Sequence, residues 1–125
     1  MSGPSVSVTL PPGRYVAVAR LLSGGFASRL DLPFEAVDSL QLAVELALRA
    51  AVPPGEEVTI DFGHDGTTVT LAISPVTADV LQTRLGGADD GADLGVLLGR
   101  LVDTVEVVAD PPSLVLRASR HLTAR

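Results

Sequence analysis

Lysine, asparagine and cysteine are all absent from the 125-residue sequence. Without cysteine, the chain can form neither a disulfide bond nor a thiolate metal site. Without lysine, it cannot build a P-loop, in which a lysine reaches the nucleotide phosphates. Without asparagine, it cannot hold any ligand that requires this side-chain amide. Several classes of catalytic and binding site are therefore excluded by composition.

Aromatic residues and positive charge are also scarce. Aromatic residues make up 3% of the chain although 46% is hydrophobic, so the core must consist of Val, Leu, Ile and Ala. The net charge of −6 argues against nucleic acid as a partner, because nucleic-acid-binding proteins carry basic surfaces. No apolar run approaches the ~20 residues of a membrane helix, and residues 1–12 do not resemble a signal peptide. We therefore expect a soluble, cytoplasmic protein that binds neither nucleic acid nor membrane.

Alternation of apolar and polar residues predicts five strands. They cover Val6–Leu10, 58–62, 69–73, 105–108 and 114–118. Gly63 and Gly66 bound a turn between the second and third runs, and 110–112 form a turn between the last two, so both pairs are expected to be hairpins.

Helical periodicity predicts helices over 14–30, 33–51 and 94–102, with a shorter one over 79–85. In the first helix, the expected apolar face has residues at steps of four: Val18, Leu22, Phe26 and Leu30. Gly24 and Gly25 interrupt this helix at about 1 kcal/mol each relative to Ala, which a tight packing contact would explain.

The second helix is apolar on two sides. Its main apolar face comprises Val37, Leu40, Val44, Ala47 and Ala51. A narrow polar stripe contains Glu45 and Arg49, spaced for an i,i+4 ion pair. A further apolar strip comprises Leu42, Ala43, Leu46 and Ala50. Such a helix must be covered on both sides, by its own chain or by a partner.

The order β, α, α, β, β, short α, loop, α, β, β predicts an α/β (α+β) fold. Hairpins favour a mixed, mostly antiparallel sheet, and the helices are expected to cover one face of it in a two-layer sandwich. The length fits one domain, and neither a repeat nor a linker divides residues 1–125.

Motifs for catalysis are weak. Asp61-Phe62-Gly63 matches a kinase triplet without any of its companion motifs. His64 in a predicted turn and His121 near the end have no neighbouring ligands for zinc. The glycine-rich loop 86–93 precedes a helix as a phosphate cradle would, but Asp93 is expected to cap that helix and repel an anion. The sequence therefore predicts no catalytic residue, cofactor site or metal site.

Three runs resemble one family. They are DSLQLAVE at 38–45, TTVTL at 67–71 and LGVLLGRLVDTVEV at 94–107. In order and spacing they are similar to motifs of the anti-sigma-factor serine kinases of the GHKL, or Bergerat-fold, ATPase superfamily. The resemblance covers nearly the whole chain and implies a Bergerat fold.

The nucleotide site of that family is degenerate here. Its general-base Glu and magnesium-binding Asn, four residues apart, fall on Leu46 and Ala50, or on Glu45 and Arg49 if the register shifts by one. The adenine-binding Asp loop is replaced by a run that begins at Ser74. In the phosphate loop, an Asp replaces a glycine. The resemblance thus implies vestigial positions only: Glu45, Leu46, Arg49, Ala50, Ser74, Gly91, Asp93 and Gly95.

A fold that is retained without its catalytic site predicts a regulator that acts by binding another protein. The resemblance implies an anti-sigma-type protein that binds a sigma factor, or an anti-anti-sigma-type antagonist, without ATP; it also implies a homodimer. Two alternatives are an ATP-dependent serine/threonine kinase with an atypical site and a small-ligand sensor with a remodelled pocket. If Leu46 fills the old pocket, its role is structural; if it faces a partner, it belongs to an interface.

Overall fold

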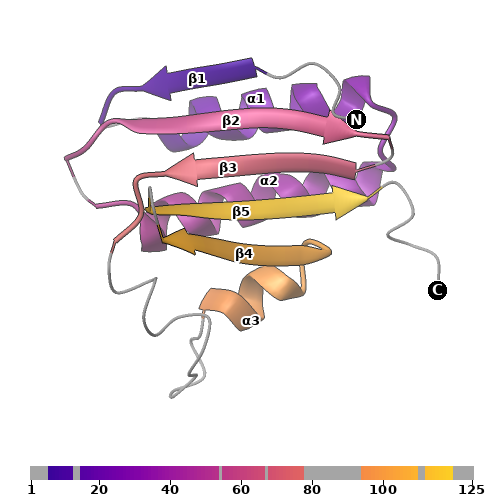
Figure 1. The fold of residues 1–125 in the computed structure, drawn as a ribbon. Coiled ribbons are helices and arrows are strands. Elements are labelled where there is room, and N and C mark those ends of the chain that lie inside the picture. The colour runs from indigo at the N-terminus through magenta and orange to yellow at the C-terminus, as the bar shows by residue number, and fades with distance from the viewer. Residues whose placement is uncertain are drawn as a thin grey trace.

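The computed structural model describes residues 6–12, 15–53, 55–66, 68–77, 94–109 and 112–119. In these ranges the chain forms five strands and three helices (Figure 1). In chain order they are β1 (Val6–Leu10), α1 (Tyr15–Arg29), α2 (Phe34–Ala51), β2 (Val58–Asp65), β3 (Thr68–Ser74), α3 (Leu94–Gly99), β4 (Thr104–Ala109) and β5 (Pro112–Ser119). The helix predicted over 79–85 and the loop 86–93 lie outside the described residues.

The strands form one sheet in the order β1-β2-β3-β5-β4. All four strand pairs are antiparallel. A mixed sheet was expected, but within the described residues no strand pair is parallel. Helices α1 and α2 lie together behind one face of the sheet (Figure 1). The α+β class and the placement of these helices on one face are confirmed.

The β2–β3 hairpin differs from its prediction. The predicted turn began at Gly63, but β2 continues to Asp65, and the chain reverses at Gly66, whose φ is 64°. A positive φ is a conformation that glycine adopts without steric cost, so the second glycine makes the turn. His64 is therefore a strand residue, and its assignment to a solvated turn was wrong.

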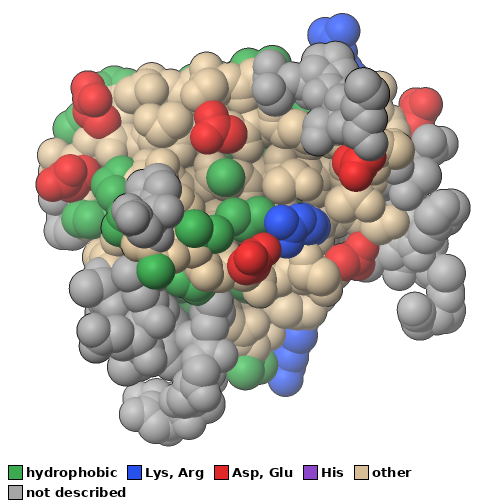
Figure 2. Space-filling view, viewed as in Figure 1, with side chains coloured by type: hydrophobic (Ala, Val, Ile, Leu, Met, Phe, Trp, Pro, Cys, Tyr) green, Lys and Arg blue, Asp and Glu red, His purple; other side chains and the backbone are tan. Residues whose placement is uncertain are grey.

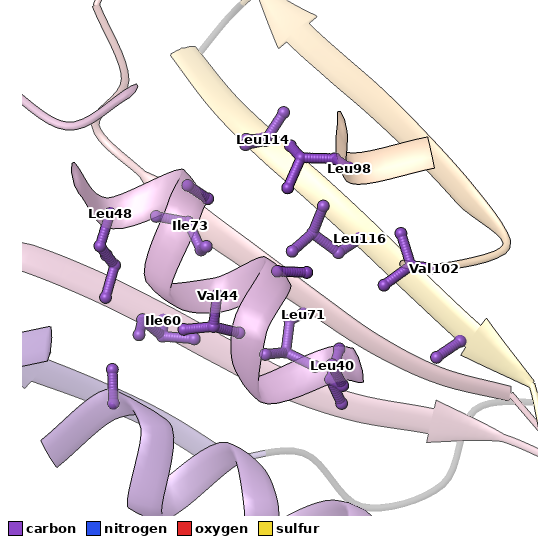
Figure 3. Packing of buried hydrophobic residues seen from close by; sticks show 14 of the residues in the cluster. Leu40, Val44, Leu48, Ile60, Leu71, Ile73, Leu98, Val102, Leu114 and Leu116 are labelled. Atoms are coloured by element: carbon purple, nitrogen blue, oxygen red, sulfur yellow. The ribbon is translucent and has the colours of Figure 1, made fainter. Parts of the chain in front are cut away.

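The core lies between α2 and the sheet. Leu40, Val44 and Leu48 project from α2 onto Ile60 and Leu71 (Figure 3). Leu98 of α3 and Val102 extend the core to β5, where they lie beside Leu114 and Leu116 (Figure 3). The aliphatic core expected from the scarcity of aromatics is present, with Phe62 as its aromatic member among the described residues.

Helix α1 packs on α2 through small residues, while three members of its predicted apolar face, Leu22, Phe26 and Leu30, are half-buried against the core. Its buried residues are Ala19, Ser23, Gly24 and Ala27, whereas Val18 is 43% exposed. Ser23 is satisfied by donating its hydroxyl hydrogen to the Ala19 carbonyl, with an Oγ–O distance of 2.7 Å. Small side chains are favoured where α1 meets α2 because they let the two helix backbones approach closely. The larger side chains of α1 lie on its flanks.

Helix α3 ends at Gly99, three residues earlier than expected. Residues 100–102 continue as a turn in which the Leu101 and Val102 amides donate to the Leu98 carbonyl. The Asp103 amide then donates to the Arg117 carbonyl on β5. Val102 remains buried, so the helical pattern correctly marked a core residue but not the helix end.

The sheet face that α1 and α2 leave uncovered is mainly polar. Outward positions on β2 and β3 include Thr59, Asp61, Thr68 and Thr70. Viewed from this side, the surface shows scattered acidic and arginine side chains, with hydrophobic groups gathered mostly on the left (Figure 2). This polarity explains why alternation identified the strands so clearly.

No helix in the described ranges combines the length and apolar character needed to span a membrane.

The two glycines of α1 make a matched stability test. A Cβ on Gly24 would collide with the side-chain amide of Gln41, whereas a Cβ on Gly25 meets nothing within 4 Å. We expect Gly24→Ala to lower the free energy of unfolding by about 0.5–1 kcal/mol, because the Gln41 side chain must swing aside and lose its hydrogen bond to the Arg20 carbonyl. Gly25→Ala should raise it by about 0.5–1 kcal/mol, since Ala is the better helix former. Urea unfolding measures both, and equal effects of the two substitutions would contradict the close contact.

Candidate functional site

Helix α2 carries half of the positions that the sequence marked as vestigial, namely Glu45, Leu46, Arg49 and Ala50. Its residues on the sheet side, including Leu40, Val44 and Ala47, are fully buried. At 3.6 residues per turn, Gln41 and Glu45 lie on one flank of that buried row. Leu46 and Ala50 lie on the opposite flank. The two possible registers of the family motif therefore correspond to two different sides of the same helix.

Helix α1 occupies the flank that carries Glu45. The Arg20 guanidinium on α1 lies 2.9 Å from the Glu45 carboxylate, and the Arg49 Nε lies 3.1 Å from its other oxygen. The expected i,i+4 pair is confirmed, and a second arginine joins it from across the helix–helix contact. On the same flank, the Gln41 side chain donates to the Arg20 carbonyl at 2.8 Å. Both Glu45 oxygens are thus engaged by cations of the chain itself.

The opposite flank of α2 is apolar and only partly covered. Leu46 is half-buried and packs against the core, whereas Leu42 and Ala50 are exposed. Ala43, the fourth member of the predicted strip, is fully buried. The strip therefore divides into a core part, Ala43 and Leu46, and a surface part.

Ser74 ends β3 opposite Thr59. The chain then buries Val76, and the Thr77 amide donates to the Ala51 carbonyl at the end of α2, at 2.8 Å. A helix end leaves its last carbonyls without partners, so this hydrogen bond satisfies one of them. The residues that follow Ser74 thus fasten the end of β3 to the end of α2.

Gly95 lies half-buried in the first turn of α3, beside the buried Leu94. Helix α3 packs on α2. Gly91 and Asp93 are outside the described residues. Among the residues that are described, no three His, Asp or Glu side chains come together as metal ligands would.

Sequence reasoning missed a groove on the outer side of α1 and α2. It has a volume of about 520 Å³, and Leu21 and Phe34 flank it with exposures of 74% and 82%. The other lining residues are Gly24, Gly25, Ser28, Leu32, Val37 and Gln41. The sequence signal for this groove was the row of small residues on α1. Because that row packs on α2, Leu21 on the other side of the helix is left exposed.

A second hollow, of about 420 Å³, lies where the end of α1 meets β1 and β2. The described residues that line it are Val6, Phe26, Arg29, Leu30 and His64. The sequence pattern placed His64 in a turn, so it did not point to this hollow.

No family model matches the sequence, and no curated protein matches it.

The role of Leu46 can be tested against its neighbour on the same strip. Leu46→Asp places a carboxylate against the core, so we expect the free energy of unfolding to fall by about 2 kcal/mol or more. Leu42 is 42% exposed, so Leu42→Asp should change it by less than about 1 kcal/mol. Chemical denaturation compares the two. A Leu46→Asp protein with wild-type stability would exclude the structural role, and loss of the partner complex in that variant would assign Leu46 to an interface.

Proposed function

We propose that this chain is a degenerate Bergerat-fold domain that acts as an anti-sigma-type regulator, binding a sigma factor or its antagonist without using ATP. The observation that carries the proposal is the groove between α1 and α2. Large apolar side chains that are mostly exposed on both walls of a concave surface are typical of protein-binding sites. Phe34 and Leu21 can each bury most of their side chains only against another molecule.

Charge around the groove favours a basic partner segment. Asp31, Glu35 and Asp38 are all exposed. In the chain, each lies next to a residue that lines the groove: Leu32, Phe34 and Val37. The whole chain carries a net charge of −6. Acidic rims steer basic partners and reject acidic ones. An amphipathic helix with apolar anchors and basic flanks fits such a groove.

The side chains at the former catalytic positions of α2 support partner binding without a nucleotide. In one register the family's catalytic pair would be Glu45 and Arg49, but Glu45 forms ion pairs with both Arg49 and Arg20. In the other register the pair would be Leu46 and Ala50, which offer no acid, base or metal ligand. Either way, α2 contributes packing and ion pairs to the fold.

The resemblance of 38–45 and 94–107 to anti-sigma serine kinases supports a sigma factor as the partner. It also extends the proposal to a homodimer and to the cytoplasm, where sigma factors act.

Partner binding is tested with the cognate sigma factors of the source organism. We expect one of them to co-elute with the protein in size-exclusion chromatography. Leu21→Asp and Phe34→Asp should each weaken that complex by about thirtyfold or more, because central apolar anchors contribute at least ~2 kcal/mol. Val96→Asp on α3 is the control, since Val96 is also exposed and lies outside the groove. Binding that survives both groove substitutions would contradict this site.

Nucleotide independence is tested by thermal denaturation with ATP and magnesium. A ligand at 100 times its dissociation constant would stabilise the fold by about 2.7 kcal/mol, which is a readily measured shift. We expect no shift. A clear increase in melting temperature would favour the kinase alternative.

A further inference from the structure

Gly25 lies in the interior of α1 and is exposed to solvent. Within the described residues, a Cβ at this position would meet nothing within 4 Å, whereas a Cβ on the neighbouring Gly24 would meet the Gln41 side chain. Glycine is less favourable than alanine inside a helix, because it loses more backbone entropy when the chain folds. Packing within the described chain therefore accounts for Gly24 but gives no reason for a glycine at position 25.

The place of Gly25 in the groove supplies a reason. Four residues of α1 line the groove, namely Leu21, Gly24, Gly25 and Ser28. Their spacing of i, i+3, i+4 and i+7 is that of the hole that receives one side chain of a facing helix in knobs-into-holes packing. The two central members of this hole have no side chain, so its floor is the backbone of α1. Because glycine permits close approach to a backbone, the hole fits a large apolar side chain of another helix.

Helix α2 supplies the second wall beside this hole. Phe34, Val37 and Gln41 line the groove from α2. Phe34 and Leu21 are both mostly exposed. A helix that lies in the groove therefore contacts α1 and α2 together, and both of these apolar side chains can pack against it. The exposed acidic residues beside the groove favour basic residues on the flanks of that helix.

We propose that Gly25 determines which partner segment the groove accepts: one large apolar side chain of a partner helix, with basic residues within one turn of it, sits directly over Gly25. This inference rests on the proposed function and names the part of the partner that the groove binds. Leu21 and Phe34 pack on either side of the inserted side chain. A side chain at position 25 would occupy the same space, so the glycine is needed for binding and is not needed for folding.

Substitution of two glycines in the full chain tests this role. Gly25→Leu should weaken the complex with the co-eluting sigma factor by about tenfold or more, because the new side chain fills the hole. Its melting temperature should not fall, since leucine is a better helix former than glycine and a Cβ at this position is unobstructed. Gly99→Leu is the matched control, because a Cβ on Gly99 at the end of α3 also meets nothing within 4 Å and Gly99 lies outside the groove. The control should bind like the unaltered protein.

A reciprocal substitution in the partner identifies the inserted side chain. Large apolar residues in the basic helical segments of the sigma factor are changed to Ala one at a time. We expect one of these changes to weaken the complex with the unaltered protein by about tenfold. The same change should strengthen the complex with the Gly25→Leu variant by about threefold or more, because the hole then holds only one of the two side chains.

Failure of this inference is distinguishable from failure of the proposed function. The role of Gly25 is overturned, and the groove remains the binding site, if Gly25→Leu binds normally while Leu21→Asp and Phe34→Asp lose the complex. It is also overturned if no apolar residue of the partner shows the reciprocal effect. If the unaltered protein forms no complex, or if both Asp variants retain it, the proposed function fails and the role of Gly25 is overturned with it.

Discussion

Three small side chains and a glycine of α1 let this helix lie against α2 so closely that the Gln41 amide reaches the Arg20 carbonyl. A Cβ on Gly24 would displace the Gln41 amide, so the hydrogen bond between Gln41 and Arg20 depends on the glycine at this position. The ion pair between Arg20 and Glu45 follows from the same approach. Such partly exposed ion pairs contribute little by themselves. The close helix contact determines where they form.

The same contact creates the proposed binding surface. With small residues facing α2, the larger apolar residues of α1 must lie on its flanks and outer side, where Leu21 meets the exposed Phe34 across the groove. It also commits Gln41 and Glu45 to the neighbouring helix. The opposite flank of α2 keeps an apolar strip in place of acids and amides. A helix that is divided in this way is suited to packing and to partner binding, which is the basis of the proposed regulatory role.

Much of the fold could be predicted because one face of the sheet is polar. Alternation located all five strands, and it placed Val58, Ile60 and Phe62 inward correctly. In α1, periodicity identified Leu22, Phe26 and Leu30, which pack on the core. It could not identify the contact with α2, because small residues carry no hydrophobic signal that marks a helix–helix face. Two glycines around His64 suggested a turn that the structure forms later, at Gly66. Of the site, the Glu45–Arg49 pair was visible in the sequence. The Arg20 contact, 25 residues away, depends on the helix packing.

Partners are proposed to bind across the outer groove of α1 and α2. Hydrogen–deuterium exchange on the complex with a co-eluting sigma factor tests this proposal most directly, because it reports which backbone segments become protected. We expect added protection in residues 17–28 and 34–41, with little change in residues 94–102. Protection concentrated in 94–102, with α1 unaffected, would contradict it and would place the partner on the opposite flank of α2.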